Sequence, residues 1–225
     1  MLHEFGLDDE FLALLSWWDG EIARIVAAAG CRRCDGPLHQ ANYHRKPRGG
    51  WIFKILAAFT LRHSLCCGHC RKRSLPPSVL FLGRRVYIES VVLLACVAPV
   101  VAKTARGLAE ITGVPVVTLH RWRAWWRDSF PVMAPWSVLR ARFAPPAPDE
   151  VDLPGSLLIR IAQDLNALAP SEATPSAVML MTARCLAPVT TSLTNAATFV
   201  RAVAAQLSSK GLTQKMSIAV GPVVP

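Results

Sequence analysis

The chain has 225 residues, of which 52% are hydrophobic and 18% are charged, and this composition excludes a wholly disordered chain. Its length allows one or two domains with a buried core. The net charge of +10 comes from residues 31–149, which hold 19 bases and five acids, whereas residues 1–30 hold one base and six acids.

The first residues contain no basic region followed by an apolar run, so the sequence predicts no secretory signal. The longest apolar run, Val91–Ala102, is shorter than the about 20 residues that a membrane span needs. We therefore expect a cytoplasmic protein with no membrane partner. In a reducing compartment, paired CxxC motifs favour metal binding over disulfides.

Residues 8–29 predict an amphipathic helix, because apolar side chains recur every three or four residues from Phe11 to Ala29. Gly30 then supplies a stop. We expect this N-terminal helical segment, residues 1–30, to pack against the rest of the protein. An alternative is that Trp17 marks a surface for a protein partner.

Residues 31–77 predict a small β-rich unit built on two cysteine pairs. Trp51–Leu56 and Phe59–Leu65 are expected to form short strands, and residues 45–50 to form a basic, glycine-rich loop. The fold expected for the whole chain is thus mainly α with a small β zinc ribbon.

The two pairs are Cys31-x2-Cys34 and Cys67-x2-Cys70, with 32 residues between them. Each CxxC turn directs two thiolates inward at the spacing of a tetrahedral Zn²⁺ site, with Zn–S bonds of ~2.3 Å. The separation exceeds the common value of about 15–20 residues, but the hairpin between two knuckles can lengthen without changing either turn. The sequence therefore predicts a closed, structural Zn²⁺ site. A redox CxxC and buried inert cysteines are the alternatives.

Cys66 is one thiol more than this site needs. Side chains alternate along an extended strand, so we assign Cys67 to the metal and Cys66 to packing. Replacement of one ligand by Cys66 or by a histidine remains an alternative, and the histidines concerned are His39, His44 and His69. Cys96 and Cys185 lie in apolar runs and are expected to be small core residues.

Basic residues surround the cysteine pairs, and contact with DNA phosphates is their expected use, with solubility as the alternative. The predicted DNA contacts of this unit are Arg45, Lys46, Arg48, Arg71, Lys72 and Arg73. Arg32, Arg33 and Arg62 are expected on the same surface.

Residues 84–143 predict a helical domain that contains a helix-turn-helix. Helical spacing covers Arg84–Val97, Lys103–Thr112 and Val116–Ser129, and Gly113 supplies the turn between the last two. The residues expected where the paired helices cross, or in the wedge between them, are Ala109, Val114, Leu119 and Trp122. A plain three-helix core unit is the alternative interpretation.

The second helix of this pair offers polar and basic side chains to DNA, and Arg121 is the expected contact with a base edge or a phosphate. The full predicted set is Thr118, His120, Arg121, Arg123 and Arg127. Apolar residues at positions 115–117 occupy the first turn, so only apolar contact with bases is expected there.

The proline-rich residues 144–155 predict a linker, because proline blocks the hydrogen bonds of both helices and strands. Residues 156–225 predict a helical region of unknown role, with helices at Leu157–Leu168 and Ala196–Leu207.

The four cysteines, together with Leu108 to Trp122, resemble the N-terminal part of bacterial insertion-sequence transposases, where a zinc ribbon precedes a helix-turn-helix. The resemblance covers residues 31–130 and implies binding of double-stranded DNA at the ends of a mobile element. Full transposases of this type continue into an RNase-H-like domain with three separated carboxylates. Here the C-terminal acids are crowded between Asp149 and Glu172, which argues against catalysis by this chain.

The expected function is therefore non-catalytic, sequence-directed DNA binding by a nucleoid-associated protein, either in a mobile element or in regulation. Two alternatives remain open at this point. One is a transposase or nuclease subunit whose active site is completed by a partner, and the other is an adaptor that binds a protein partner or forms a homodimer.

Overall fold

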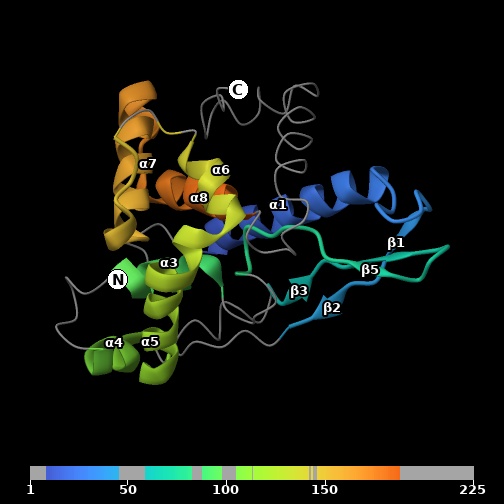
Figure 1. Ribbon diagram of the computed structural model, residues 1–225, viewed down its shortest axis with the longest axis horizontal. Coiled ribbons are helices and arrows are strands. Elements are labelled where there is room, and N and C mark those ends of the chain that lie inside the picture. The colour runs from blue at the N-terminus through green and yellow to red at the C-terminus, as the bar shows by residue number, and fades with distance from the viewer. Residues whose placement is uncertain are drawn as a thin grey trace.

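The computed structural model describes residues 9–45, 59–82, 88–97, 105–112, 114–141, 143 and 146–187. Several predicted features lie outside these ranges. They are the strand at Trp51–Leu56, the helix at Ala196–Leu207, the turn residue Gly113 and the basic residues Lys46 and Arg48. Within the described ranges the chain is mainly helical with a small sheet, which confirms the predicted fold class in its coarse form (Figure 1).

Helix α1 spans Asp9–Ala28 and confirms the amphipathic helix predicted at residues 8–29. Its apolar face, which includes Leu15, Trp18 and Ile22, is buried in the core. The helix ends before Gly30, whose φ of 77° is accessible to glycine at little cost. Trp17, on the other face, is 45% exposed.

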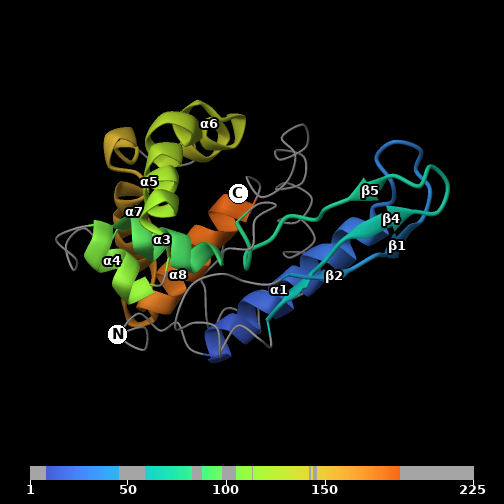
Figure 2. The ribbon, with the colours of Figure 1, turned by 90° about the horizontal axis from the view of Figure 1, so that it is seen from below.

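A small antiparallel sheet follows α1 in the chain. Strands β1 (Leu38–Gln40), β4 (Leu65–Cys67) and β5 (Arg73–Ser74) lie in the order β1-β4-β5, and β2 (Tyr43–His44) pairs with β3 (Leu61–Arg62). The predicted strand at Phe59–Leu65 is thus divided between β3 and β4. Figure 2 shows the strands running beside α1.

The rest of the described chain is helical. Its α-helices are α3 (Glu89–Val97), α4 (Ala105–Thr112), α5 (Val116–Ala124), α6 (Ala134–Arg140), α7 (Gly155–Leu168) and α8 (Pro175–Leu186). A π-helix at Trp125–Ser129 continues α5, and 3₁₀ turns lie at Phe130–Val132, Glu150–Asp152 and Pro170–Glu172. Buried side chains from α1, β4 and α3 to α8 form one hydrophobic core.

The proline-rich stretch predicted as a linker makes tertiary contacts where the structure describes it. A carboxylate oxygen of Glu150 accepts hydrogen bonds from the Trp136 indole at 2.8 Å and from Arg140 at 2.6 Å. Arg160 donates to the Pro146 carbonyl at 2.6 Å. These bonds attach the stretch to α6 and α7.

A buried polar network joins α1 to the end of the β-rich unit. Asp19 accepts hydrogen bonds from the Ser78 hydroxyl at 2.5 Å and from the Val79 backbone N–H at 2.7 Å. Arg62, fully buried on β3, donates to the Pro76 carbonyl at 2.7 Å. Burial raises the pKa of Asp19 to about 6, although Ser78 and the positive charge of Arg62 act to lower it.

None of the described helices combines the length and the apolar character needed to cross a membrane. The longest of them, α1, carries charged residues along its exposed side.

Candidate metal centre

The first cysteine pair lies in a tight turn directly after α1. We call residues 31–36 the first knuckle. The Cys31 backbone N–H donates to the Gly36 carbonyl at 2.9 Å, and the Asp35 N–H donates to the Cys31 carbonyl at 2.7 Å. These two bonds close the turn, so both sulfurs lie on the same side of it.

The second pair has the same backbone pattern. In this second knuckle, residues 67–72, the Cys67 N–H donates to the Lys72 carbonyl at 3.0 Å and the Arg71 N–H donates to the Cys67 carbonyl at 3.1 Å. The residue after each second cysteine, Asp35 or Arg71, has a left-handed backbone conformation. The two knuckles are therefore equivalent, position for position.

The sheet brings the two knuckles together. In the β1–β4 register Leu38 is opposite Cys67, and the Gly68 N–H donates to the Pro37 carbonyl at 2.9 Å. Because β1 follows the first knuckle and β4 enters the second, this pairing places the two turns at one end of the sheet.

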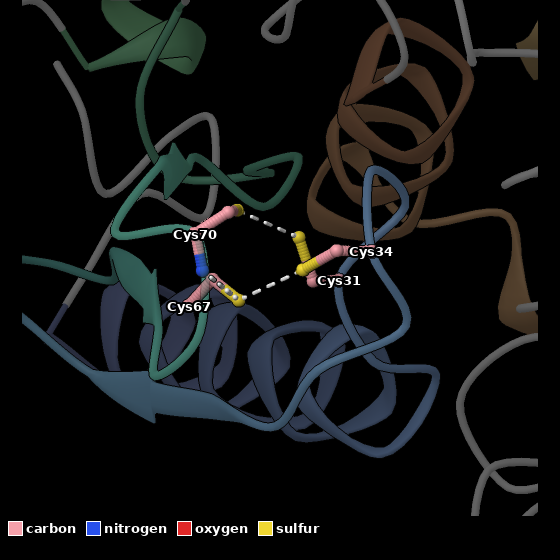
Figure 3. A group of neighbouring side chains, drawn as sticks. All are labelled: Cys31, Cys34, Cys67 and Cys70. Atoms are coloured by element: carbon pink, nitrogen blue, oxygen red, sulfur yellow. Dashed lines mark hydrogen bonds between the residues drawn. The ribbon is translucent and has the colours of Figure 1, made fainter.

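The sulfurs of these four cysteines lie within 4.8 Å of one another. The Cys31–Cys70 and Cys34–Cys67 sulfur pairs are 3.6 and 3.5 Å apart, and none of the four forms a disulfide (Figure 3). A tetrahedral site with metal–sulfur bonds of about 2.3 Å places its sulfurs roughly 3.8 Å apart. The arrangement therefore fits a metal ion and supplies four protein ligands.

The thiol pKa values also reflect this crowding. Burial acts to raise the pKa of Cys67, but the backbone N–H groups of Cys70 and His69 and the thiol of Cys34 lower it to about 6. The backbone N–H of Gly36 acts to lower the pKa of Cys34, but the Cys67 thiol, burial and the thiols of Cys70 and Cys31 raise it to about 11. Four adjacent thiolates repel one another, so a cation among them would offset this repulsion.

Cys66 lies outside the metal group, as the alternation of side chains along β4 predicted. Its thiol is directed at the carbonyl oxygens of Cys67 and Arg71, with sulfur–oxygen distances of 3.8 and 3.7 Å. The histidines are also outside the group of four sulfurs.

Two of these histidines pack across the knuckles instead. A Cβ atom added to Gly36 in the first knuckle would lie 2.7 Å from the His69 Nδ1 and 3.1 Å from the Cys67 sulfur. A Cβ atom added to Gly68 in the second knuckle would lie 2.9 Å from the His39 Nε2. Each knuckle thus has a glycine where a side chain from the other half of the unit approaches.

We expect Gly36→Ala to weaken metal binding by about tenfold or more, as changes next to metal ligands commonly do. The added methyl group must displace His69 or the ligand sulfur of Cys67. Competition with a coloured chelator measures the change. Gly155→Ala is the matched control, because a Cβ there meets nothing within 4 Å, and it should leave metal affinity unchanged. Equal affinities of both variants and wild type would contradict the prediction.

Exposed bases lie within the two knuckles and directly after the second one. They are Arg32 and Arg33 in the first knuckle, Arg71 and Lys72 in the second, and Arg73 on β5. Arg45 is half-buried, donates to the Tyr43 hydroxyl at 2.9 Å and lies over its ring. Arg62 is buried, which corrects its predicted place on this surface, because its guanidinium lies near Asp19 and bonds to Pro76.

The second predicted site uses α4 and α5, which are in contact with each other. Val114, Leu119 and Trp122 are buried, as predicted for the wedge between paired helices. Figures 1 and 2 both show α4 and α5 at the opposite end of the molecule from the sheet.

The predicted contacts on α5 differ in exposure. His120 and Arg121 are exposed, and Arg123 is half-buried. Arg127 is exposed but donates to Asp128 at 2.7 Å. Thr118 is only 9% exposed, which corrects its predicted place on the DNA-facing side, because it lies on the buried stripe with Leu119 and Trp122.

The sequence-based interpretation missed the knuckle residues that are not cysteines. Gly36 could have been noticed in the sequence, because it follows the second cysteine of its pair by two positions. Its close approach to His69, however, depends on the folded sheet.

The chain matches no protein-family model, no curated protein and no solved structure.

Proposed function

We propose that this chain is a non-catalytic DNA-binding protein in which Cys31, Cys34, Cys67 and Cys70 hold a structural Zn²⁺. The observation that carries the proposal is the group of four sulfurs within 4.8 Å, bordered by exposed bases. Zn²⁺ favours four thiolates in a tetrahedron and, when bound by four protein ligands, has no open position for a substrate. Its role here is to stabilise the fold.

The exposed bases supply the second part of the argument. Five arginine and lysine side chains project from the two knuckles and β5, on a small unit whose backbone is fixed by paired strands. Such a surface attracts a polyanion, and the release of counterions makes binding depend on salt. Because DNA phosphates are closely and regularly spaced, a fixed group of bases can contact several of them.

The α4–α5 pair provides a second surface for the same partner. Its wedge residues are buried and its exposed side carries His120 and Arg121, as a recognition helix requires. Val117 at the start of α5 is 67% exposed, and its side chain suits apolar contact with a thymine methyl group. The resemblance to insertion-sequence transposases supports the same proposal, with a role in a mobile element or in regulation and a location at the nucleoid.

The test is the affinity for a labelled DNA duplex of mixed sequence, measured over a series of salt concentrations. For wild type we expect the association constant to fall steeply between about 50 and 200 mM salt. Arg121→Ala should weaken binding and reduce the slope of log K against log salt by about 1. A flat salt dependence for wild type would contradict the proposal.

Arg106→Ala is the matched control for Arg121→Ala. Arg106 is exposed on the neighbouring helix α4, where its Nε atom lies 3.6 Å from the Oε1 atom of Glu110. Its replacement removes the same charge from the other helix of the pair. We expect a smaller loss of affinity than for Arg121→Ala, and equal losses would argue against α5 as the contacting helix.

A further inference from the structure

The two knuckles share an unusual backbone feature. Asp35 and Arg71 have φ values of 52° and 58°, and they are the non-glycine residues with positive φ in the part of the chain that the structure describes. Each directly follows the second cysteine of its pair. The left-handed region disfavours residues with a Cβ atom, and glycine is the residue that occupies it without this cost.

The two residues differ in how well they suit this conformation. Aspartate is among the residues that tolerate the left-handed region, because its short side chain bonds locally. Arginine has no such advantage, so glycine at position 71 would adopt the backbone conformation of the second knuckle with less strain. Backbone strain at an exposed residue is therefore a reason to look for a use of its side chain.

The surroundings of Arg71 fix its backbone and leave its side chain exposed. Its N–H donates to the Cys67 carbonyl at 3.1 Å, and its own carbonyl accepts the Cys66 thiol at a sulfur–oxygen distance of 3.7 Å. The exposed side chain extends from this fixed backbone, directly after Cys70 of the candidate metal group. When the backbone of an arginine is already fixed, little backbone freedom is lost as its side chain binds a phosphate.

Charge separates the two equivalent knuckles. The first contains Arg32, Arg33 and the acid Asp35, whereas the second contains Arg71 and Lys72 with no acid and leads directly to Arg73. At the matched position, therefore, one knuckle carries a negative charge and the other a positive charge. A polyanion that approaches the metal centre is repelled at one of these positions and attracted at the other.

We propose that the second knuckle is the side of the metal centre that contacts the nucleic-acid backbone, and that Arg71 binds a phosphate there. Both knuckles then hold the metal, and the first knuckle lies toward the edge of the contact. This inference rests on the proposed DNA-binding function, and it adds which knuckle faces the DNA and which residue makes the contact.

The experiment compares three variants of the full, metal-loaded chain on a labelled DNA duplex in a salt series. Arg71→Gly introduces the residue that this backbone conformation favours, so the metal content should be unchanged and the melting temperature unchanged or higher. The same change should raise the Kd about fivefold and reduce the salt slope by about 1. A loss of binding without a loss of stability separates a phosphate contact from a structural role.

Asp35→Gly and Arg33→Ala are the matched controls. Asp35→Gly makes the equivalent backbone change in the first knuckle but removes a negative charge, so the Kd should stay the same or fall. Arg33→Ala removes one exposed positive charge from the first knuckle, and we expect a much smaller rise in Kd than for Arg71→Gly.

Two results would overturn the inference while wild type still binds DNA with the expected salt dependence. One is an Arg71→Gly variant with the Kd and slope of wild type. The other is an equal loss of binding in Arg71→Gly and Arg33→Ala, which would indicate a uniform field around both knuckles. Salt-independent binding, or none, by wild type would instead contradict the proposed function itself.

Discussion

Replacing Cys67 with serine is expected to abolish stoichiometric metal binding and to unfold the sheet that joins the two knuckles. Cys67 is fully buried, and its sulfur lies 3.5 Å from the Cys34 sulfur and accepts the Cys70 backbone N–H at 3.4 Å. A structural Zn²⁺ contributes about 10–16 kcal/mol to folding in zinc-finger peptides. Strands β1, β4 and β5 have only two or three residues each, so their pairing cannot replace this contribution. Elemental analysis gives the metal-to-protein ratio, and the near-ultraviolet circular dichroism reports the loss of packing.

The neighbouring thiol gives a matched control. Cys66→Ser makes the same chemical change one position earlier in β4, where the side chain is directed at the carbonyl oxygens of Cys67 and Arg71. This variant should keep one metal ion per chain and the spectrum of wild type. Loss of the metal from Cys66→Ser, or its retention by Cys67→Ser, would show that the ligand set is assigned wrongly.

The cluster of four cysteines could be predicted from the sequence because the shape of each pair depends on local spacing. Two cysteines separated by two residues occupy one tight turn, and alternation along a strand separates Cys66 from Cys67. The structure agrees on both points. Helix α1 could be predicted for a similar reason, since its apolar residues repeat at helical spacing over the whole segment.

Features that depend on contacts distant in sequence could not be predicted in this way. The ring of His69 approaches Gly36 only after β1 pairs with β4. The left-handed conformation of Arg71 could not be predicted either. A glycine at this position would have suggested such a conformation, whereas an arginine does not. Prediction of the candidate metal ligands was therefore easier than prediction of the surfaces around them.

The assignment of Thr118 to the DNA-facing side failed for a different reason. Its hydroxyl suggested a polar contact, but it precedes the buried Leu119 by one residue and Trp122 by four. Helical periodicity thus places it on the inner stripe of α5, and here position outweighed residue type. For the exposed residues His120 and Arg121, helical position and residue type lead to the same prediction.

Replacing Asp19 with alanine is expected to destabilise the protein by about 1–3 kcal/mol, the usual cost of leaving a buried hydrogen-bonding group unsatisfied, with a further loss from the buried charge of Arg62 that Asp19 offsets. Asp19 is 1% exposed, and the guanidinium of Arg62 beside it is fully buried. Within the part of the chain that the structure describes, the Arg62 Nε and Nη1 atoms have no hydrogen-bond partner, and the negative charge of Asp19 acts against the effect of burial to keep the guanidinium protonated. The change also removes the acceptor for Ser78 and Val79, which would free the end of the β-rich unit from α1.

Urea unfolding at a pH well above 6, where Asp19 is ionised, measures this loss. Asp152→Ala removes an exposed aspartate and should change the free energy of unfolding by no more than about 0.5 kcal/mol. The double variant Asp19→Ala with Arg62→Met tests the cause, because it removes the charge that the first change leaves unpaired. If unpaired charge is the main cost, the double variant is more stable than Asp19→Ala alone. If it is equally unstable or less stable, the lost hydrogen bonds to Ser78 and Val79 account for the effect, and the pairing of Asp19 with Arg62 contributes little.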